Sequence, residues 1–278
     1  MMKETRAEHL AVEKLRPFEG HPFKVVDNEE MDQLTWSILT QGLLSPLVVR
    51  PLPNGEYEVI SGHRRLHACK KAGIETVPAL IYAIDRDAAA IALVDSNLQR
   101  EHILPSEKAF AYKLKLEAMN HQGRTSGQVG QKWTRDEIAE GESGRQVQRY
   151  IRLTNLIPGI LQKVDEGRIA LTPAVELSYL TDAEQEDLQE TMESEDCTPS
   201  LSQAMLLKAT SQAGQLTMDK IFTIMTQPKP NQQEKISFKV SEIRDYFPRG
   251  YTASQMTRDI LKGLELLRQQ RQRNRDAR

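Results

Sequence analysis

A strand that turns at once into a helix constrains this fold more than any other stretch. Tyr57–Ile60 alternates and is rich in β-branched residues, which predicts a strand. Ser61-Gly62 then opens a short helix that Gly73 ends in the left-handed conformation. Backbone N–H groups at a helix start carry partial positive charge, and glycine lets an anion approach them. With Arg64 and Arg65 in the first turn, the stretch predicts a phosphate site; a surface helix with solvated arginines is the alternative.

The flanking segments predict a small α+β domain. Asn54-Gly55 stands between alternating runs at 46–50 and 57–60, which is a strong hairpin signal, and 77–82 predicts a further strand. Residues 1–11 are polar and expected to be loose, with Ala11-Val12 a candidate start for an edge strand. Two helices are expected, one from a cap at Asp27 or Asn28 to Gly42 with Met31, Leu34, Ile38 and Leu39 buried, and one from Asp85 to about Leu93.

The sequence becomes helical throughout from Pro105 onward. A helix starting at Ser106-Glu107 is expected to bury Phe110, Leu114 and Ala118 and to fade into a flexible polar run at 120–128. Further helices are predicted after Thr172-Pro173, over the acidic stretch 182–193, and at 200–209 and 218–225. Residues 226–233 are expected to be a linker, 236–240 a strand, and 252–273 a helix with one apolar side and a basic end.

Two helices in this second part predict DNA binding. Thr134-Arg135-Asp136-Glu137 is a capping box for a short helix halted at Gly141, and Ser143 caps a second helix that Pro158 ends. A short helix, a glycine turn and a second helix with a buried Val/Ile stripe form the helix-turn-helix pattern. Arginine reads guanine and glutamine reads adenine in the major groove, although an ordinary amphipathic helix pair gives the same pattern. The candidate DNA-binding residues are Ser143, Arg145, Gln146, Gln148, Arg149 and Arg152.

Charge, cysteines and hydropathy limit the remaining classes. The net charge of −2 hides an acidic stretch at 176–196, with nine acidic residues and no lysine or arginine, and a basic end at 244–278. Cys69 and Cys197 belong to no metal-binding or disulfide pattern. There is no long apolar run and no signal-like start, so we expect a cytoplasmic protein, associated with nucleoid or plasmid DNA, without a membrane segment.

Three motifs in order resemble the ParB partition family, over about residues 10–225. Gln41-Gly42-Leu43-Leu44-Ser45-Pro46 resembles its first motif, and Ser61-Gly62-His63-Arg64-Arg65-Leu66-His67-Ala68 resembles GERRxxA. The run from Asp95 to Glu107, with Asn97-Leu98-Gln99-Arg100 inside it, resembles ENLQRxxLxPxE. The C-terminal part resembles ParB-like proteins of mobile or conjugative elements.

The resemblance implies a homodimeric DNA clamp gated by CTP and Mg²⁺. It implies that Arg64 and Arg65 hold the triphosphate beside Gly62, that Asn97 ligates the magnesium ion, and that nucleotide closes a ring after loading at a centromere-like DNA site. A ParA-like ATPase is an implied partner. The implied nucleotide-binding residues are Gly42, Ser61, Gly62, His63, Arg64, Arg65, Asn97, Gln99 and Arg100.

Two departures from the family pattern bear on catalysis. His63 stands where GERR has glutamate, and Ser96 stands where ENLQR has glutamate. Hydrolysis needs a group that positions or deprotonates water, so we expect slow or absent turnover and assign no catalytic residue. His63 taking over that role is the alternative.

Other functions compete with this one. The runner-up is a site-specific repressor or accessory regulator whose N-terminal domain only dimerises. The small α+β fold also resembles sulfiredoxin, certain serine kinases and nucleases, but Ser61-Gly62-His63-Arg64 lacks the sulfiredoxin cysteine, and Asp95 and Glu101 are the only nuclease-type carboxylates suggested.

We expect an α+β ParB/sulfiredoxin-like domain over 1–104, an all-α domain with the helix-turn-helix over 105–225, and a linker with a C-terminal helical segment over 226–278, a candidate dimerisation element or basic tail.

Overall fold

The protein forms two compact units, Met1–Gln227 and Pro228–Arg278. The computed structural model describes residues 6–100, 102–125, 142–227, 243, 246–248 and 250–276. The predicted helix opened by Thr134 and the predicted strand at 236–240 lie outside these residues. Within the described residues, no helix combines the length and apolar character that crossing a membrane requires. The boundary expected at 104/105 falls inside the first unit and stays a prediction.

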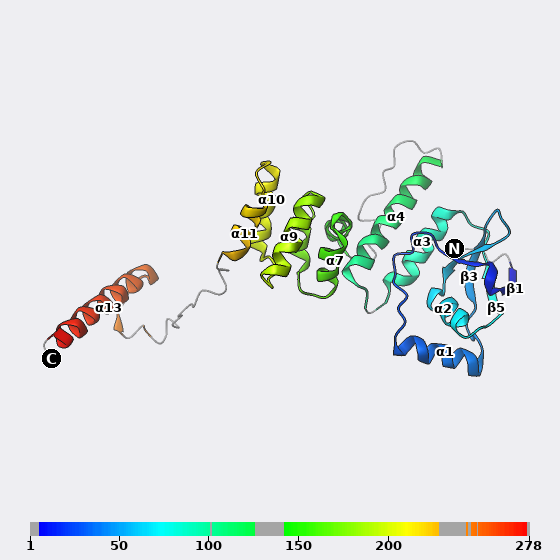
Figure 1. Ribbon diagram of the computed structural model, residues 1–278, viewed down its shortest axis with the longest axis horizontal. Helices are drawn as coiled ribbons and strands as arrows, with labels where there is room; N and C mark the ends of the chain where they lie inside the picture. Colours follow the sequence, from blue (N-terminus) through cyan, green and yellow to red (C-terminus); the bar gives the residue numbers. More distant parts are fainter. Residues whose placement is uncertain are drawn as a thin grey trace. The chain divides into compact units, whose positions relative to one another are not determined.

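A five-stranded mixed sheet forms the first part of the first unit (Figure 1). The strand order is β1-β5-β3-β4-β2, with β1 and β5 antiparallel, β5 and β3 parallel, β3 and β4 antiparallel, and β4 and β2 parallel. The predicted hairpin around Asn54-Gly55 is confirmed as the β3–β4 pair. The strands are β1 (Arg6–Ala11), β2 (Leu15–Pro17), β3 (Leu47–Pro51), β4 (Tyr57–Ser61) and β5 (Thr76–Ile81), with a 3-10 turn at Val12–Lys14.

The expectation that residues 1–11 are loose is wrong for the described part of that segment. Arg6–Ala11 is an edge strand that pairs along its length with β5. Its sequence is polar because most of its side chains are exposed; only Leu10 is buried. Pairing with a strand distant in the sequence, rather than local hydrophobic alternation, therefore makes this segment extended.

Helices pack on both faces of the sheet, and the sheet separates two hydrophobic cores. On β4, Val59 joins the core beneath α1 (Glu29–Gln41) and α2 (His63–Lys71), whereas Ile60 joins the core of α3 (Arg86–Leu98). Neighbouring residues of a strand point to opposite faces, which gives this division. Asn28 caps α1 and Asp85 caps α3 through their side chains, as the sequence predicts. Leu39 was expected to be buried, but it lies exposed on α1.

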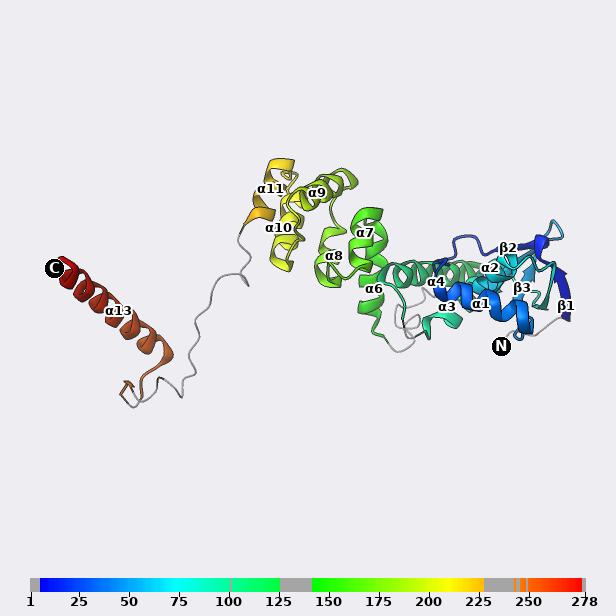
Figure 2. The ribbon, with the colours of Figure 1, turned by 60° about the horizontal axis from the view of Figure 1, so that its bottom comes forward.

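The helix α4 (Pro105–Thr125) lies beside α3 and leads into the helical part (Figures 1 and 2). It continues to Thr125, so the polar run expected to be flexible from 120 onward is helical as far as that residue. Phe110 was expected to be buried, but it is exposed, and the buried positions are Ser106, Ala109, Ala111, Tyr112, Lys115 and Ala118. The small side chains of Ala111 and Ala118 pack in the core shared with α3.

The helices between residues 144 and 226 pack around a separate core that includes Ala109 of α4, which α6 meets only through the half-buried Tyr150. They are α6 (Gly144–Arg152), a 3-10 turn at Leu153–Asn155, α7 (Pro158–Asp165), α8 (Leu171–Leu177), α9 (Asp182–Ser194), α10 (Leu201–Gln212) and α11 (Met218–Thr226). Pro158 was expected to end the helix that Ser143 caps. Instead, α6 ends at Arg152, and Pro158 stands at the first position of α7. In the second unit, α13 (Ala253–Asp276) buries Met256 and leaves Leu261, Leu264 and Leu267 exposed.

Candidate nucleotide and DNA interfaces

The glycine turn predicted from the sequence is present at the start of α2. Gly62 takes the left-handed conformation with φ of 103°, and the first helical hydrogen bond runs from the Leu66 N–H to the Gly62 carbonyl. The backbone N–H groups of the three residues between them therefore have no acceptor within the helix. A Cβ atom at Gly62 would lie 2.6 Å from Cδ2 of Leu47, so only glycine fits here.

The two arginines of the first turn have different surroundings. Arg65 donates from Nη1 to the backbone carbonyls of Ser45, at 2.5 Å, and Pro46, at 2.9 Å, and burial lowers the pKa of its guanidinium. It ties the loop after Gly42 to the glycine turn, so it acts mainly as a brace. Arg64 is more exposed and forms an ion pair with Glu30 of α1, with 3.0 Å between Nη2 and Oε2.

The second cluster, at the end of α3, meets the first one. Burial lowers the pKa of Arg100, the charge of Glu107 opposes this shift, and the charge of Arg64 adds to it. Arg100 also lowers the pKa values of His21 and His63, although burial is the main cause for both. Two cations held close together favour an anion between them. The structure thus brings Arg100 near Arg64, which lies in the first turn of the helix that Gly62 begins.

A row of aromatic rings, which the sequence did not reveal, links the two clusters. The imidazoles of His63 and His21 stack with centroids 3.7 Å apart, and the Phe23 ring lies edge-on to His21 at 5.7 Å. The Arg100 guanidinium lies over Phe23, with Cζ 5.6 Å from the ring centroid. The His21-Pro22-Phe23 segment carries no motif of its own, so only the folded chain shows its place in the site.

His63 is held as a neutral ring. Its Nε2 accepts a hydrogen bond from the Phe18 N–H at 3.3 Å, and burial lowers its pKa to about 3, with contributions from His21 and Arg100. A hydrogen bond with the backbone of Val59 opposes this shift. Neither the lone pair nor the pKa suits a general base near neutral pH. Ser96, at the other departing position, hydrogen-bonds to the carbonyl of Leu93 on its own helix.

Asn97 presents an oxygen without a partner among the described residues. Its side chain is buried on α3, and Nδ2 donates to the Leu93 carbonyl at 2.7 Å and to Oγ of Ser96 at 3.3 Å. The buried Oδ1 accepts no hydrogen bond. A buried polar atom left unsatisfied needs an explanation, and a hard cation is one that suits an amide oxygen. The helix was expected to end near Leu93, but it continues to Leu98 and so carries Asn97.

The remaining predicted residues of the two clusters are placed by the ends of their secondary-structure elements. Ser61 ends β4, and Gly42 ends α1 in the left-handed region with φ of 75°. Gln99 is the C-terminal cap residue of α3 and is exposed. The nuclease reading gains no support, because Asp95 pairs with Lys115, at 2.6 Å, and Glu101 lies outside the described residues. In the described part of the chain, no group of three or more metal-binding side chains occurs.

The helix predicted to recognise DNA is formed as α6, and its polar side chains differ in exposure and in the contacts they make. Ser143 caps α6 by accepting a hydrogen bond from the Gln146 N–H, and Val147 is buried against Tyr112. Arg145 is exposed and Gln148 is half-buried. Since the first helix of the predicted pair lies outside the described residues, the helix-turn-helix as a whole stays a prediction.

Two candidate DNA-reading arginines are held inside the chain. Arg149 donates to Oε1 of Gln146 at 3.0 Å and to Oγ1 of Thr172 at 2.6 Å. Arg152 donates to the carbonyl of Ser178 at 2.7 Å and stacks on Tyr179, with Cζ 3.9 Å from the ring centroid. These contacts position α6 against α8, and they leave Arg145 as the arginine of α6 that is most free to reach a ligand.

Comparison with known proteins identifies the family. The family model of the ParB N-terminal domain matches residues 1–98. The probable chromosome-partitioning protein ParB of Vibrio cholerae is 30% identical over 270 residues, which cover 96% of this chain and 87% of that protein.

Two solved structures of C-terminally truncated ParB from Caulobacter crescentus are also similar. The structure complexed to the centromeric parS site has a TM-score of 0.43 and 24% identity and covers 73% of this chain and 99% of that one. The structure complexed with CTP-gamma-S has a TM-score of 0.33 and 26% identity and covers 68% and 99%. The length and identity of the Vibrio match show that this chain belongs to the ParB family of chromosome-partitioning proteins.

Proposed function

We propose that this ParB-type partition protein binds CTP with Mg²⁺ at the Gly62 site and loads onto a centromere-like DNA site through α6. The observation that carries the proposal is that Arg100, from the second sequence cluster, lies near Arg64 and His63 of the first, at the start of α2. A site built from a helix start and two arginines suits a polyphosphate better than a single carboxylate.

Each residue of the site has a distinct task in this proposal. The backbone N–H groups of the first turn of α2 donate to phosphate oxygens, and Arg64 and Arg100 balance the phosphate charge. Arg65 holds the loop after Gly42 in place through its hydrogen bonds to Ser45 and Pro46. Triphosphate charge would also relieve the repulsion between Arg64 and Arg100.

Asn97 fits the magnesium ion that the family resemblance implies. Its Oδ1 is buried without a hydrogen-bond partner among the described residues, and Mg²⁺ takes one or two protein oxygens alongside phosphate oxygens and water. The ion, when bound, neutralises phosphate charge. The hydrogen bond from Nδ2 to the Leu93 carbonyl keeps the amide oriented so that the oxygen remains the ligand.

Weak or absent hydrolysis follows from the two departing positions. His63 uses its Nε2 to accept the Phe18 N–H, and Ser96 offers a hydroxyl rather than a carboxylate. The site therefore binds and holds a nucleotide without an evident group to activate water. Gating is the remaining step of the proposal: CTP must bind the closed homodimer better than the open one. A ParA-like ATPase partner and the mobile-element affiliation stay predictions.

Equilibrium binding of the four nucleoside triphosphates tests the proposal. The titration is run with and without Mg²⁺ and with and without DNA recovered with the protein from its host. We expect CTP to bind in preference to the other three, in a Mg²⁺-dependent way, and to increase crosslinking between N-terminal domains. Specific DNA binding without nucleotide binding or nucleotide-dependent crosslinking would instead favour the repressor.

A further inference from the structure

Arg64, the freer arginine of the proposed phosphate site, already has an anionic partner. Its Nη2 donates to Oε2 of Glu30 at 3.0 Å, from the second residue of α2 to the second residue of α1. A carboxylate and a phosphate present the same kind of oxygen acceptor to a guanidinium. Glu30 therefore occupies the donor that a bound polyphosphate would use.

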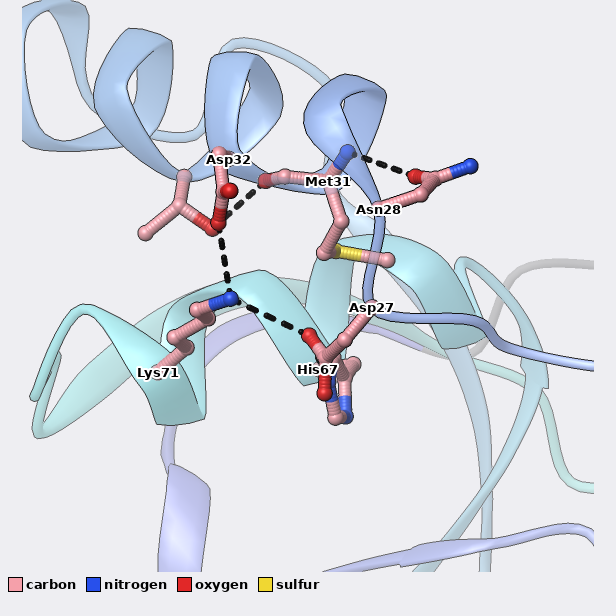
Figure 3. A network of polar contacts seen from close by, with 7 residues as sticks. Asp27, Asn28, Met31, Asp32, His67 and Lys71 are labelled. Carbon is pink, nitrogen blue, oxygen red and sulfur yellow. Dashed lines mark hydrogen bonds and ion pairs between the residues drawn. The ribbon is translucent and has the colours of Figure 1, made fainter.

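A clamp of four residues keeps this partner in reach (Figure 3). Lys71 of α2 lies between two carboxylates, with Nζ 2.8 Å from Oδ1 of Asp32 and 3.2 Å from Oδ1 of Asp27. His67, one turn earlier on α2, places Nε2 3.1 Å from the same Oδ1 of Asp27. The acidic first turn of α1 is thus fastened along the basic side of α2, on which Arg64 precedes His67 by three residues. Glu30 is consequently a resident partner of Arg64.

We propose that Glu30 is a built-in competitor that sets how tightly and how long the site holds a nucleotide. This inference rests on the proposed function. A phosphate that takes the same N–H donor of Arg64 Nη2 must displace Glu30, and a phosphate that takes another donor of this guanidinium lies beside the Glu30 carboxylate and is repelled by it. The Glu30 side chain is 69% exposed, and exposed ion pairs are weak. Glu30 therefore lowers affinity by a modest factor without closing the site.

Matched charge variants of the full chain test this competition. Glu30→Gln removes the competing charge, whereas Glu29→Gln removes the preceding charge on the same helix and serves as the control for net charge. Each variant is titrated with CTP–Mg²⁺ and with inorganic tripolyphosphate, and nucleotide release is followed by stopped flow. We expect Glu30→Gln to bind both about two- to fivefold more tightly and to release CTP more slowly, and Glu29→Gln to show less than half of that gain.

A second variant separates the contact from the charge. Glu30→Asp keeps the charge but shortens the side chain by one methylene, so we expect it also to bind more tightly than the natural chain. Equal gains in Glu30→Gln and Glu29→Gln, or no gain in Glu30→Gln and Glu30→Asp, would overturn the competition while leaving nucleotide binding in place. Binding of neither CTP nor tripolyphosphate by the natural chain and every variant would overturn both this inference and the proposed function. Thermal melts of each variant establish that the fold is intact.

Discussion

The Nε2 atom of His63 accepts the backbone N–H of Phe18, at 3.3 Å, so the ring that replaces the family glutamate has its lone pair in use. Its pKa, lowered by burial to about 3, keeps it neutral at working pH. This pairing favours a structural role for His63 over the catalytic one that the sequence left open. His63 is better placed to hold the segment 18–23 onto the glycine turn than to activate water.

Phosphate release from CTP is therefore expected to stay near the uncatalysed background, even with cognate DNA. His63→Gln keeps a hydrogen-bond acceptor near Phe18 and should leave this rate unchanged. The rate should also be flat between about pH 6 and about pH 8, because the His63 pKa lies far below that range. A measured turnover that falls at least tenfold in His63→Gln would show that the imidazole handles the attacking water.

Acid should destabilise the N-terminal region through the stacked histidines. Burial lowers the pKa of His21 to about 4 and that of His63 to about 3, whereas an unfolded histidine binds a proton near about pH 6.5. Between those values the unfolded chain binds more protons, so the free energy of unfolding is at its full value above about pH 6.5 and falls as the pH drops. The expected loss is about 1 kcal/mol per histidine for each pH unit in this window.

Urea denaturation at several pH values between about 7 and about 5 measures this loss. The double variant His21→Asn with His63→Gln removes both groups, so its free energy of unfolding should depend less steeply on pH than that of the natural chain. Equal slopes in the two proteins would mean that the imidazoles titrate normally in the folded state.

Replacing Gly62 should damage the fold of the glycine turn as well as its ligand binding. In Gly62→Ala the new Cβ would lie 2.6 Å from Leu47 Cδ2, on a backbone with φ of 103° that alanine rarely adopts. We expect a loss of about 1–3 kcal/mol in the free energy of unfolding, measured by denaturant titration. Gly55→Ala is an informative control, since it shares a positive φ of 79° but has open space around its Cβ position. A smaller loss at Gly62 than at Gly55 would contradict the steric argument.

Local signals in the sequence were enough to predict the glycine turn and most element boundaries. These signals are the turns at Asn54-Gly55 and Ser61-Gly62 and the cap at Ser143. Each depends only on residues close in the sequence, so it can be recognised without knowing the tertiary structure. The family resemblance, rather than any local pattern, implied that the Gly62 and Asn97 clusters meet, and Arg64 and Arg100 do lie close enough for their charges to interact.

Partnerships between distant residues could not be predicted in the same way. β1 is extended because β5 offers a free edge, although its own residues are polar. Arg65 is a brace because two carbonyls, at Ser45 and Pro46, face it after folding. Likewise, the stacking of His21 on His63 and the exposure of Phe110 depend on how helices and loops pack. No pattern within one segment encodes these relationships.

Variants of α6 should separate DNA contact from helix positioning. Arg145 is exposed, whereas Arg152 is bonded to Ser178 and stacked on Tyr179. Arg145→Ala should cost about 1–3 kcal/mol of specific binding if it reads a base, or lower the salt slope by about one if it contacts a phosphate. Arg152→Ala should weaken binding by misplacing α6 while leaving the salt slope unchanged. Binding titrations over a range of salt concentrations distinguish these outcomes; a lower slope in Arg152→Ala would assign that residue to the phosphate backbone.

If Asn97 ligates Mg²⁺, the Mg²⁺ dependence of CTP binding should require its side chain. Its Oδ1, which accepts no hydrogen bond from the described residues, is the expected ligand, and its Nδ2 donates to the Leu93 carbonyl at 2.7 Å and to Ser96 Oγ at 3.3 Å. Asn97→Ala should reduce CTP affinity in Mg²⁺ to the level that the natural chain shows in EDTA, and it should lower the free energy of unfolding by about 1 kcal/mol. Ser96→Ala, which removes the neighbouring hydroxyl, is the matched control and should keep its Mg²⁺ dependence, because the Asn97 oxygen remains. If Asn97→Ala kept the full Mg²⁺ dependence, phosphate oxygens and water alone would hold the ion. The role of Asn97 would then be limited to the end of α3.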